Sequence, residues 1–144
     1  MNYIQNMRKM IGNETLLTVG CGIIIEQNNQ ILLQHRTDAD VWGIPGGVIE
    51  MGEQVEDTAR RETLEETGLT AGNLELFGIY SGQEGYAQYA NGDQVYSIQL
   101  IFLTTTVMGD LIQVSDESHA HQYFDKNNLP NNINSHQKRF IMDW

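Results

Sequence analysis

The sequence feature that most constrains the fold is an acidic segment between Gly47 and Leu69, GVIEMGEQVEDTARRETLEETGL. It carries seven acidic and two basic residues, a net charge of −5 (2 − 7) within 23 residues. Its second part has the composition of a helix, which we expect over residues 54–67. Within that helix Glu62, Glu65 and Glu66 are spaced i, i+3 and i+4, so their carboxylates share one face.

Carboxylates on one helix face repel each other, and like charges at i, i+4 weaken a helix. A hard divalent cation removes this repulsion, because Mg²⁺ prefers carboxylate oxygens together with water and phosphate oxygens. The three glutamates are therefore candidate metal ligands, and the alternative is an acidic face that contacts only solvent. Beside them Ala59 and Thr63 are small enough for the helix to pack closely on strands. Gly68, followed by the apolar Leu69, predicts the C-terminal end of the helix.

The rest of the chain contains more strand-like than helix-like segments. Strands are expected over residues 16–26, 31–34, 74–81, 94–106 and 121–125, an extended glycine-rich segment over 42–48, and further helices over 3–11 and 135–142. Asn28-Asn29 predicts a hairpin turn, and residues 82–93 have the composition of a polar, flexible loop. The apolar stretch from 95 to 107 is interrupted by Ser97 and Gln99 and indicates one long strand. We expect an α/β protein of the α+β type, with helices packed on a mixed sheet.

The length and net charge of the chain limit the number of domains and the kinds of partner that we expect. A chain of 144 residues is expected to form one domain, residues 1–144. Eight Lys and Arg against 19 Asp and Glu give a net charge of −11, which argues against nucleic acid and an anionic membrane surface as partners. With one cysteine, no signal-peptide pattern and no run of 18 apolar residues, we expect no disulfide, no membrane span and a cytoplasmic location.

The spacing within Gly47–Leu69 resembles the box of the Nudix hydrolase family, G-x5-E-x7-R-E-U-x-E-E-x-G-U, where U is usually aliphatic. Eight of its nine fixed or class positions match, and the exception is Thr63. Because threonine is β-branched and close to valine in volume, we expect this change to loosen packing slightly and to leave catalysis undisturbed. The preceding WGIPGG at residues 42–47 is similar to the usual lead-in of the family.

This resemblance implies a Nudix α/β/α sandwich that hydrolyses a pyrophosphate bond in a nucleoside diphosphate linked to another moiety, with Mg²⁺ or Mn²⁺ as the cofactor. The implied metal ligands are the carbonyl of Gly46 and the carboxylates of Glu62, Glu65 and Glu66. Glu62 is implied as either a ligand or the general base. A further ligand or base is expected downstream of the box, where Asp116 and Glu117 are the candidates. We favour Glu117, at the start of a predicted strand.

The resemblance also implies structural roles for Gly47, Glu53, Arg61 and Gly68. Arg61 would pair with Glu53 and hold the loop of the box onto the helix. Arg36, at the end of a predicted strand, would contact a substrate phosphate, and the alternative is a solvated arginine.

The residues that bind the organic part of the substrate are less constrained. Tyr86 and Tyr89 are candidates for stacking on a nucleobase, because an aromatic ring can stack on any base. The alternative is that they pack the loop against the sheet. His119 and His121 are expected to be surface histidines rather than a metal-binding pair.

Two other functions fit the same motif. One is a nucleoside-triphosphate pyrophosphohydrolase of the sanitising type that cleaves oxidised dGTP, and the other is a non-catalytic nucleotide-binding Nudix module. The intact acidic positions favour catalysis over the binding module. The expected partner is a small nucleotide derivative. The helix at 3–11, which is rich in methionine, is either the interface of a homodimer or a cap on the sheet.

Overall fold

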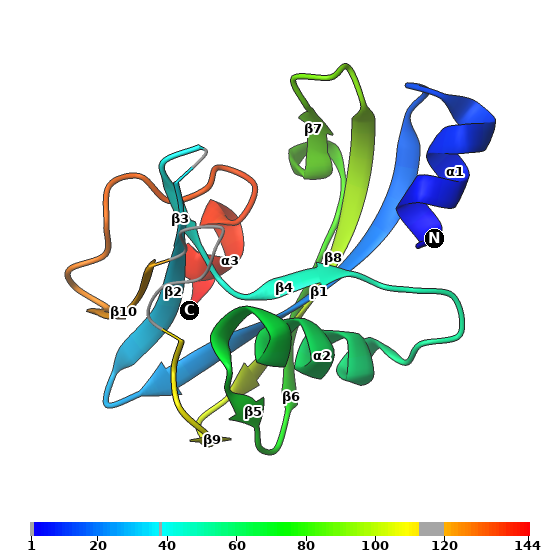
Figure 1. The fold of residues 1–144 in the computed structure, drawn as a ribbon. Helices are drawn as coiled ribbons and strands as arrows, with labels where there is room; N and C mark the ends of the chain where they lie inside the picture. Colours follow the sequence, from blue (N-terminus) through cyan, green and yellow to red (C-terminus); the bar gives the residue numbers. More distant parts are fainter. Residues whose placement is uncertain (1, 38, 113–119) are drawn as a thin grey trace.

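The computed structural model describes residues 2–37, 39–112 and 120–144 (Figure 1). In chain order its elements are α1 (Tyr3–Ile11), β1 (Leu16–Gln27), β2 (Gln30–Arg36), β3 (Val41–Gly43), β4 (Gly46–Val48), α2 (Val55–Thr67), β5 (Thr70–Ala71), β6 (Glu75–Tyr80), the 3₁₀ turn η1 (Gln83–Gly85), β7 (Tyr86–Gln88), β8 (Gln94–Thr104), β9 (Val107–Met108), β10 (Ala120–Asp125) and α3 (Lys138–Asp143). These elements follow the predicted order.

The main sheet has the strand order β10-β2-β1-β8-β6. Its central pair, β1 and β8, is parallel and extends from Leu16 opposite Val95 to Ile25 opposite Thr104. The neighbouring pairs along this path are antiparallel. This arrangement is the mixed sheet that the sequence predicts.

β1 and β2 form a hairpin that is paired only next to its turn. Asn28 and Asn29 have φ angles of 52° and 63°, the left-handed conformation of a two-residue turn, which confirms the turn prediction. Away from the turn β4 pairs with β1, while β3 pairs with β2. The segment from β3 to β4 therefore lies where the two halves of the sheet separate, and it brings a glycine-rich strand to the middle of the molecule.

Helices cover both faces of this sheet. On one face Ile23 and Ile25 of β1 share an apolar cluster with Ala59 of α2. Ile24 belongs to a second cluster that contains Phe140 of α3. Successive side chains of a strand point to opposite faces, so β1 is buried between the two helices. This layering agrees with the expected sandwich.

Residues 82–93 differ from the flexible loop that their composition predicts. They form η1, β7 and a tight turn, and β7 pairs antiparallel with β8. The turn is closed by the N–H of Tyr89, which donates to the carbonyl of Asp93 at 2.9 Å. β7 has only three residues, too few for a strand pattern to be recognised from sequence. Within the described ranges, no helix has the length and apolar composition needed to cross a membrane.

Candidate active site

The inner face of α2 is built from small side chains. Thr58, Ala59, Thr63 and Thr67 are all fully buried against the rest of the molecule. The helix ends at Gly68, whose φ of 79° is left-handed and favours glycine. The predicted close packing of the helix is therefore confirmed, and its glutamate face is held against β4.

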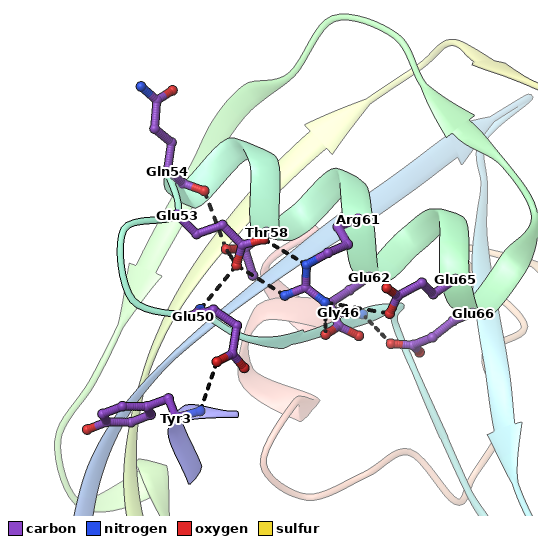
Figure 2. A network of polar contacts seen from close by, with 10 residues as sticks. All are labelled: Tyr3, Gly46, Glu50, Glu53, Gln54, Thr58, Arg61, Glu62, Glu65 and Glu66. Carbon is purple, nitrogen blue, oxygen red and sulfur yellow. Dashed lines mark hydrogen bonds and ion pairs between the residues drawn. The ribbon is translucent and has the colours of Figure 1, made fainter. Parts of the chain in front are cut away.

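The first part of the box forms a hydrogen-bonded network that Figure 2 shows. The guanidinium of Arg61 donates from Nε to Glu53 Oε2 at 2.7 Å and from Nη2 to Glu53 Oε1 at 3.1 Å. Thr58 Oγ1 and the N–H of Glu50 also donate to Glu53, at 2.6 and 3.1 Å. These donors, Arg61 first, lower the pKa of Glu53 to about 2. The predicted pairing of Arg61 with Glu53 is therefore present in the structure.

Arg61 also contacts two of the candidate metal ligands. Its Nη1 donates to Glu62 Oε1 at 2.9 Å and lies 3.5 Å from Glu65 Oε2. The side chain of Glu65 is 58% exposed, whereas that of Glu62 is 20% exposed. Arg61 therefore extends from the structural pair to the glutamate face.

Glu66 is partly buried, and its hydrogen-bond partners differ from those of the other two glutamates. It accepts hydrogen bonds from the Gln34 side-chain amide and, at 3.3 Å, from the N–H of Gly46. Burial, together with the negative charge of Glu62, nevertheless raises the pKa of Glu66 to about 7. A carboxylate with this environment gains more from a nearby cation than an exposed one does.

Glycines allow β4 to approach both the helix and the neighbouring strand. A Cβ on Gly46 would lie 2.6 Å from the carbonyl oxygen of Cys21, and a Cβ on Gly47 would overlap the carboxylate of Glu62. A larger residue at position 46 would push β4 away from β1, and one at position 47 would displace the Glu62 carboxylate. The position implied for the Gly46 carbonyl is thus next to the helix face that carries Glu62 and Glu66.

The donors at this place fit a hard divalent cation by their chemistry, because all of them are oxygens and the partly buried Glu66 has no cationic partner among the described residues. In the described residues, no three His, Cys, Asp or Glu side chains converge on a single point. Glu62 and Glu65 both contact Arg61, and Glu62 also lies close enough to Glu66 to raise its pKa. Asp116 and Glu117 lie outside the described residues.

A cleft extends from β4 to the β7–β8 hairpin. It consists of two adjoining spaces of about 170 Å³ each, which share Tyr89, Ser97, Gln99 and Gln137 in their walls. Gly46 and Gly47 line its inner end, so the same glycines that contact the glutamates also border the cleft. A ligand in the cleft would therefore reach the carboxylate site across β4.

The residues predicted to bind substrate occupy different places. Arg36 and Tyr89 line the cleft, and Tyr89 is 56% exposed. Tyr86 instead packs on Tyr96, with ring centroids 5.1 Å apart, and its hydroxyl donates to Gln94 Oε1 at 2.7 Å. Tyr89 is thus placed to stack on a ligand, whereas Tyr86 is engaged within its own hairpin.

Three glutamines that were not among the predicted site residues border the site. Gln34 donates to Glu66, Gln99 lies over Gly20, and the Oε1 atom of Gln137 accepts from the N–H of Ile44 at 2.7 Å. A signal existed for Gln99, because Ser97 and Gln99 are polar positions two residues apart in an apolar strand and therefore mark one polar face. Gln34 and Gln137 had no comparable signal.

The prediction of surface histidines is wrong for His121, which is 6% exposed. Its Nε2 lies 3.3 Å from Gln34 Oε1, because β10 pairs with β2 and places the two side chains next to each other. His119 lies outside the described residues. His121 therefore contributes to the buried polar contacts behind Glu66 rather than to the surface.

Comparison with known proteins agrees with this geometry. The model of the NUDIX domain family matches residues 16–144. An ADP-ribose pyrophosphatase from Methanocaldococcus jannaschii is 35% identical over 124 residues, which cover 84% of this chain and 69% of that protein. The 8-oxo-dGTP diphosphatase of Escherichia coli is 40% identical over 65 residues, which cover 42% of this chain and 50% of that protein. A crystal structure of a MutT NUDIX hydrolase from Burkholderia pseudomallei superposes with a TM-score of 0.75 at 27% identity, over 88% of this chain and 96% of that chain. This chain therefore belongs to the NUDIX family and is a Nudix pyrophosphohydrolase.

Proposed function

We propose that this chain, as one domain over residues 1–144, cleaves a pyrophosphate bond in a nucleoside diphosphate linked to another moiety, with Mg²⁺ or Mn²⁺ as its cofactor. The observation that carries the proposal is the partly buried Glu66 carboxylate, whose pKa is raised to about 7 by desolvation and by the neighbouring Glu62. A desolvated carboxylate next to a second carboxylate destabilises a fold unless a cation compensates it. A divalent ion with attached phosphates supplies such a cation.

The residues around Glu66 have different proposed roles. Glu62, Glu65, Glu66 and the Gly46 carbonyl would hold the ion, which when bound neutralises phosphate charge and makes water more acidic. Gln34 and the Gly46 N–H fix the orientation of Glu66. Glu62 is one candidate for the base that accepts a proton from the attacking water, and Glu117 is the other. Arg36, at the cleft, would hold a phosphate oxygen.

The extent of similarity to known proteins favours a linked nucleoside diphosphate over a nucleoside triphosphate, and the lining of the cleft bears on the base. The similarity to the archaeal ADP-ribose pyrophosphatase extends over 84% of this chain, whereas that to the E. coli 8-oxo-dGTP diphosphatase extends over 42%. In addition, Gln99 and Gln137 present side-chain amides to the cleft. An amide can form two hydrogen bonds with adenine at N6 and N7. We therefore place an adenine nucleotide derivative first among the substrates.

The test is a panel of linked nucleoside diphosphates and nucleoside triphosphates, assayed with Mg²⁺ and with Mn²⁺, with the products identified by mass spectrometry. We expect a linked diphosphate to give the highest kcat/KM and to release a nucleoside monophosphate. Excess chelator should abolish turnover. A triphosphate as best substrate, with pyrophosphate released, would favour the sanitising function. Tight nucleotide binding without turnover would favour the binding module.

Tyr89 and Tyr86 offer a prediction about the cleft. Removing a ring that stacks on a base costs about 1–3 kcal/mol of binding, which is roughly a 5- to 150-fold rise in KM. We expect this rise for Tyr89→Ala, with kcat nearly unchanged, because stacking is shared by the ground and transition states. Tyr86→Ala should raise KM less, since its ring packs on Tyr96. Steady-state kinetics of both variants test this prediction. An unchanged KM for Tyr89→Ala would mean that the base binds at another wall of the cleft.

A further inference from the structure

The helix α1 lies outside the part of the chain that matches the NUDIX model, which begins at residue 16. It is well defined locally, because Asn2 and Gln5 form a capping box at its start and the chain turns at Gly12. A nine-residue helix is nevertheless marginal by itself in water. Contacts with the rest of the protein therefore have to hold it in place.

The first end of α1 is attached to the loop between β4 and α2. The N–H of Tyr3 donates to Glu50 Oε1 at 2.8 Å, in a partly buried position. A carboxylate at this place also compensates the unpaired N–H groups and the positive dipole end of the helix. Glu50 in turn donates its own N–H to Glu53, which is paired with Arg61. Figure 2 shows this continuous set of contacts from Tyr3 to the glutamate face.

The second end of α1 is attached to the β7–β8 hairpin through Arg8. Its guanidinium donates to the carbonyl oxygens of Gly12, Glu14 and Gln94 at 2.9, 2.6 and 2.8 Å. Its Nε lies 3.5 Å from Asp93 Oδ2, and the Arg8 side chain is only 14% exposed. One arginine therefore fastens the end of the helix to the base of the hairpin.

These two attachment points belong to opposite parts of the site. Glu50 lies in the loop that leads from β4 to the catalytic helix, whereas Asp93 and Gln94 close the hairpin whose Tyr89 lines the cleft. In Figure 1, α1 lies beside the starts of β1 and β8. The helix therefore spans from the loop next to the carboxylates to the wall of the cleft.

We propose that α1 is a clamp that positions the 49–54 loop and the β7–β8 hairpin relative to each other, with Tyr3, Arg8 and Glu50 as its positioning residues. This inference rests on the proposed function for the meaning of the two parts. The clamp acts on the binding of ion and substrate through these segments, and none of its residues takes part in the chemical step.

A clamp predicts a cross-effect: a substitution at one end of α1 should change the segment attached to the other end. Independent surface contacts would not produce this effect. If α1 acts as one body, releasing either end should loosen both attached segments. We therefore expect Arg8→Ala to speed amide hydrogen exchange about tenfold in residues 49–54 as well as in the hairpin. Glu50→Ala should do the same in residues 86–95. The double variant should add little to either single variant, since the second attachment is already released.

Two matched controls are available in the full-length chain. Lys9→Ala removes a positive charge from the same helix at an exposed position and should leave exchange unchanged. Glu50→Gln keeps the acceptor oxygen for Tyr3 and should restore most of the effect of Glu50→Ala. We also expect Arg8→Ala and Glu50→Ala to weaken Mn²⁺ or substrate binding about threefold to tenfold, less than the 10–100-fold loss typical of residues that hydrogen-bond to the metal ligands themselves.

Hydrogen exchange confined to the segment next to each substitution, or lower melting temperatures with unchanged Mn²⁺ affinity and KM, would overturn the clamp. Exchange is measured on metal-free protein without nucleotide, so this result does not depend on turnover. If no nucleotide is hydrolysed while the cross-effect is present, the proposed function fails and the clamp stands.

Discussion

The two ends of α2 carry glutamates in opposite electrostatic environments. Before its first turn Glu53 accepts two hydrogen bonds from Arg61, and its pKa is lowered to about 2. In its last turn burial, together with Glu62, raises the pKa of Glu66 to about 7. The same residue type is therefore stabilised as an anion at one end and destabilised at the other.

This difference separates structure from function within one motif. The pair of Glu53 and Arg61 is complete without any ligand, so its contribution belongs to the folded chain itself. Glu66 is held in place by Gln34 and Gly46, yet within the described part of the chain no cation compensates its negative charge. A protein retains such an arrangement where a ligand completes it. Substitutions of Glu66 and of Glu53 test this difference at each end.

The largest expected effect is on turnover, from Glu66→Gln. Glutamine keeps the size and hydrogen-bonding capacity of the side chain but removes a negative charge from the proposed metal site. We expect kcat to fall by about a hundredfold or more, while the stability of the metal-free protein stays equal or rises because repulsion on the face is relieved. Steady-state kinetics and thermal unfolding measure both. An unfolded variant whose residual folded fraction turns over normally would make this face structural.

The second prediction is a pH dependence of the metal-free protein. Because the folded state holds the Glu66 proton more tightly, this stabilisation is complete below about pH 4.5 and is lost as pH rises through about 7. At about 1.4 kcal/mol per pKa unit, the free energy of unfolding should fall by about 2–3 kcal/mol over that interval. Denaturant unfolding in the presence of chelator measures it. The slope should be absent in Glu66→Gln, and a slope that persists there would assign it to another group.

Glu53→Gln tests the other end and should show the reverse pattern. Its carboxylate stabilises the fold above pH 4.5, and this contribution is lost as pH falls toward about 2. At neutral pH we expect a loss of about 1.5–3 kcal/mol of stability, as for a hydrogen bond to a charged group. Turnover should fall far less than in Glu66→Gln. Glu56→Gln, at an exposed position in the first turn of α2, is the control. Equal losses of turnover in Glu53→Gln and Glu66→Gln would contradict the separation of a structural end from a functional end.

The two ends also differ in how much could be predicted from sequence. Arg61 and Glu53 are at fixed spacing within the family box, so the resemblance to that box was enough to imply their pairing. The environment of Glu66 depends on Gln34, which is 32 residues away and reaches it only because β2 passes beside α2. Fixed spacing thus predicts contacts within the box. Contacts between strands and helices that are far apart in sequence can be identified only from the three-dimensional structure.

The cleft shows the same limit. The glutamines at 99 and 137 are far apart in sequence, and each is accommodated by a glycine on a different strand, Gly20 and Gly43. No pattern within either segment predicts that they meet. The sequence shows that Ser97 and Gln99 form a polar face of their strand. It does not indicate on which face of the sheet the cleft lies. The fold class, by contrast, followed from the order of strand-like and helix-like segments along the chain, in which strands outnumber helices.

The smallest expected effect concerns Thr63, between the two ends, where the family motif usually has an aliphatic residue. Its hydroxyl is buried and has no hydrogen-bond partner among the described residues. Thr67, one turn later, is also fully buried, but its hydroxyl donates to the carbonyl of Thr63 at 2.6 Å and accepts from the N–H of Leu69 at 3.1 Å.

Replacing an unpaired buried hydroxyl by a methyl group removes a desolvation cost, whereas replacing a paired one loses its hydrogen bonds. We therefore expect Thr63→Val to raise the free energy of unfolding by about 1 kcal/mol and Thr67→Val to lower it by about as much. In a chain of this size, 1 kcal/mol corresponds to roughly 2–4 °C in melting temperature. Both variants remove the same atom from the same buried face, so size and helix propensity cancel in the comparison. Kinetic constants should stay unchanged in Thr63→Val. If both substitutions shift stability in the same direction, the packing of this face, and not the pairing of its hydroxyls, determines their contribution.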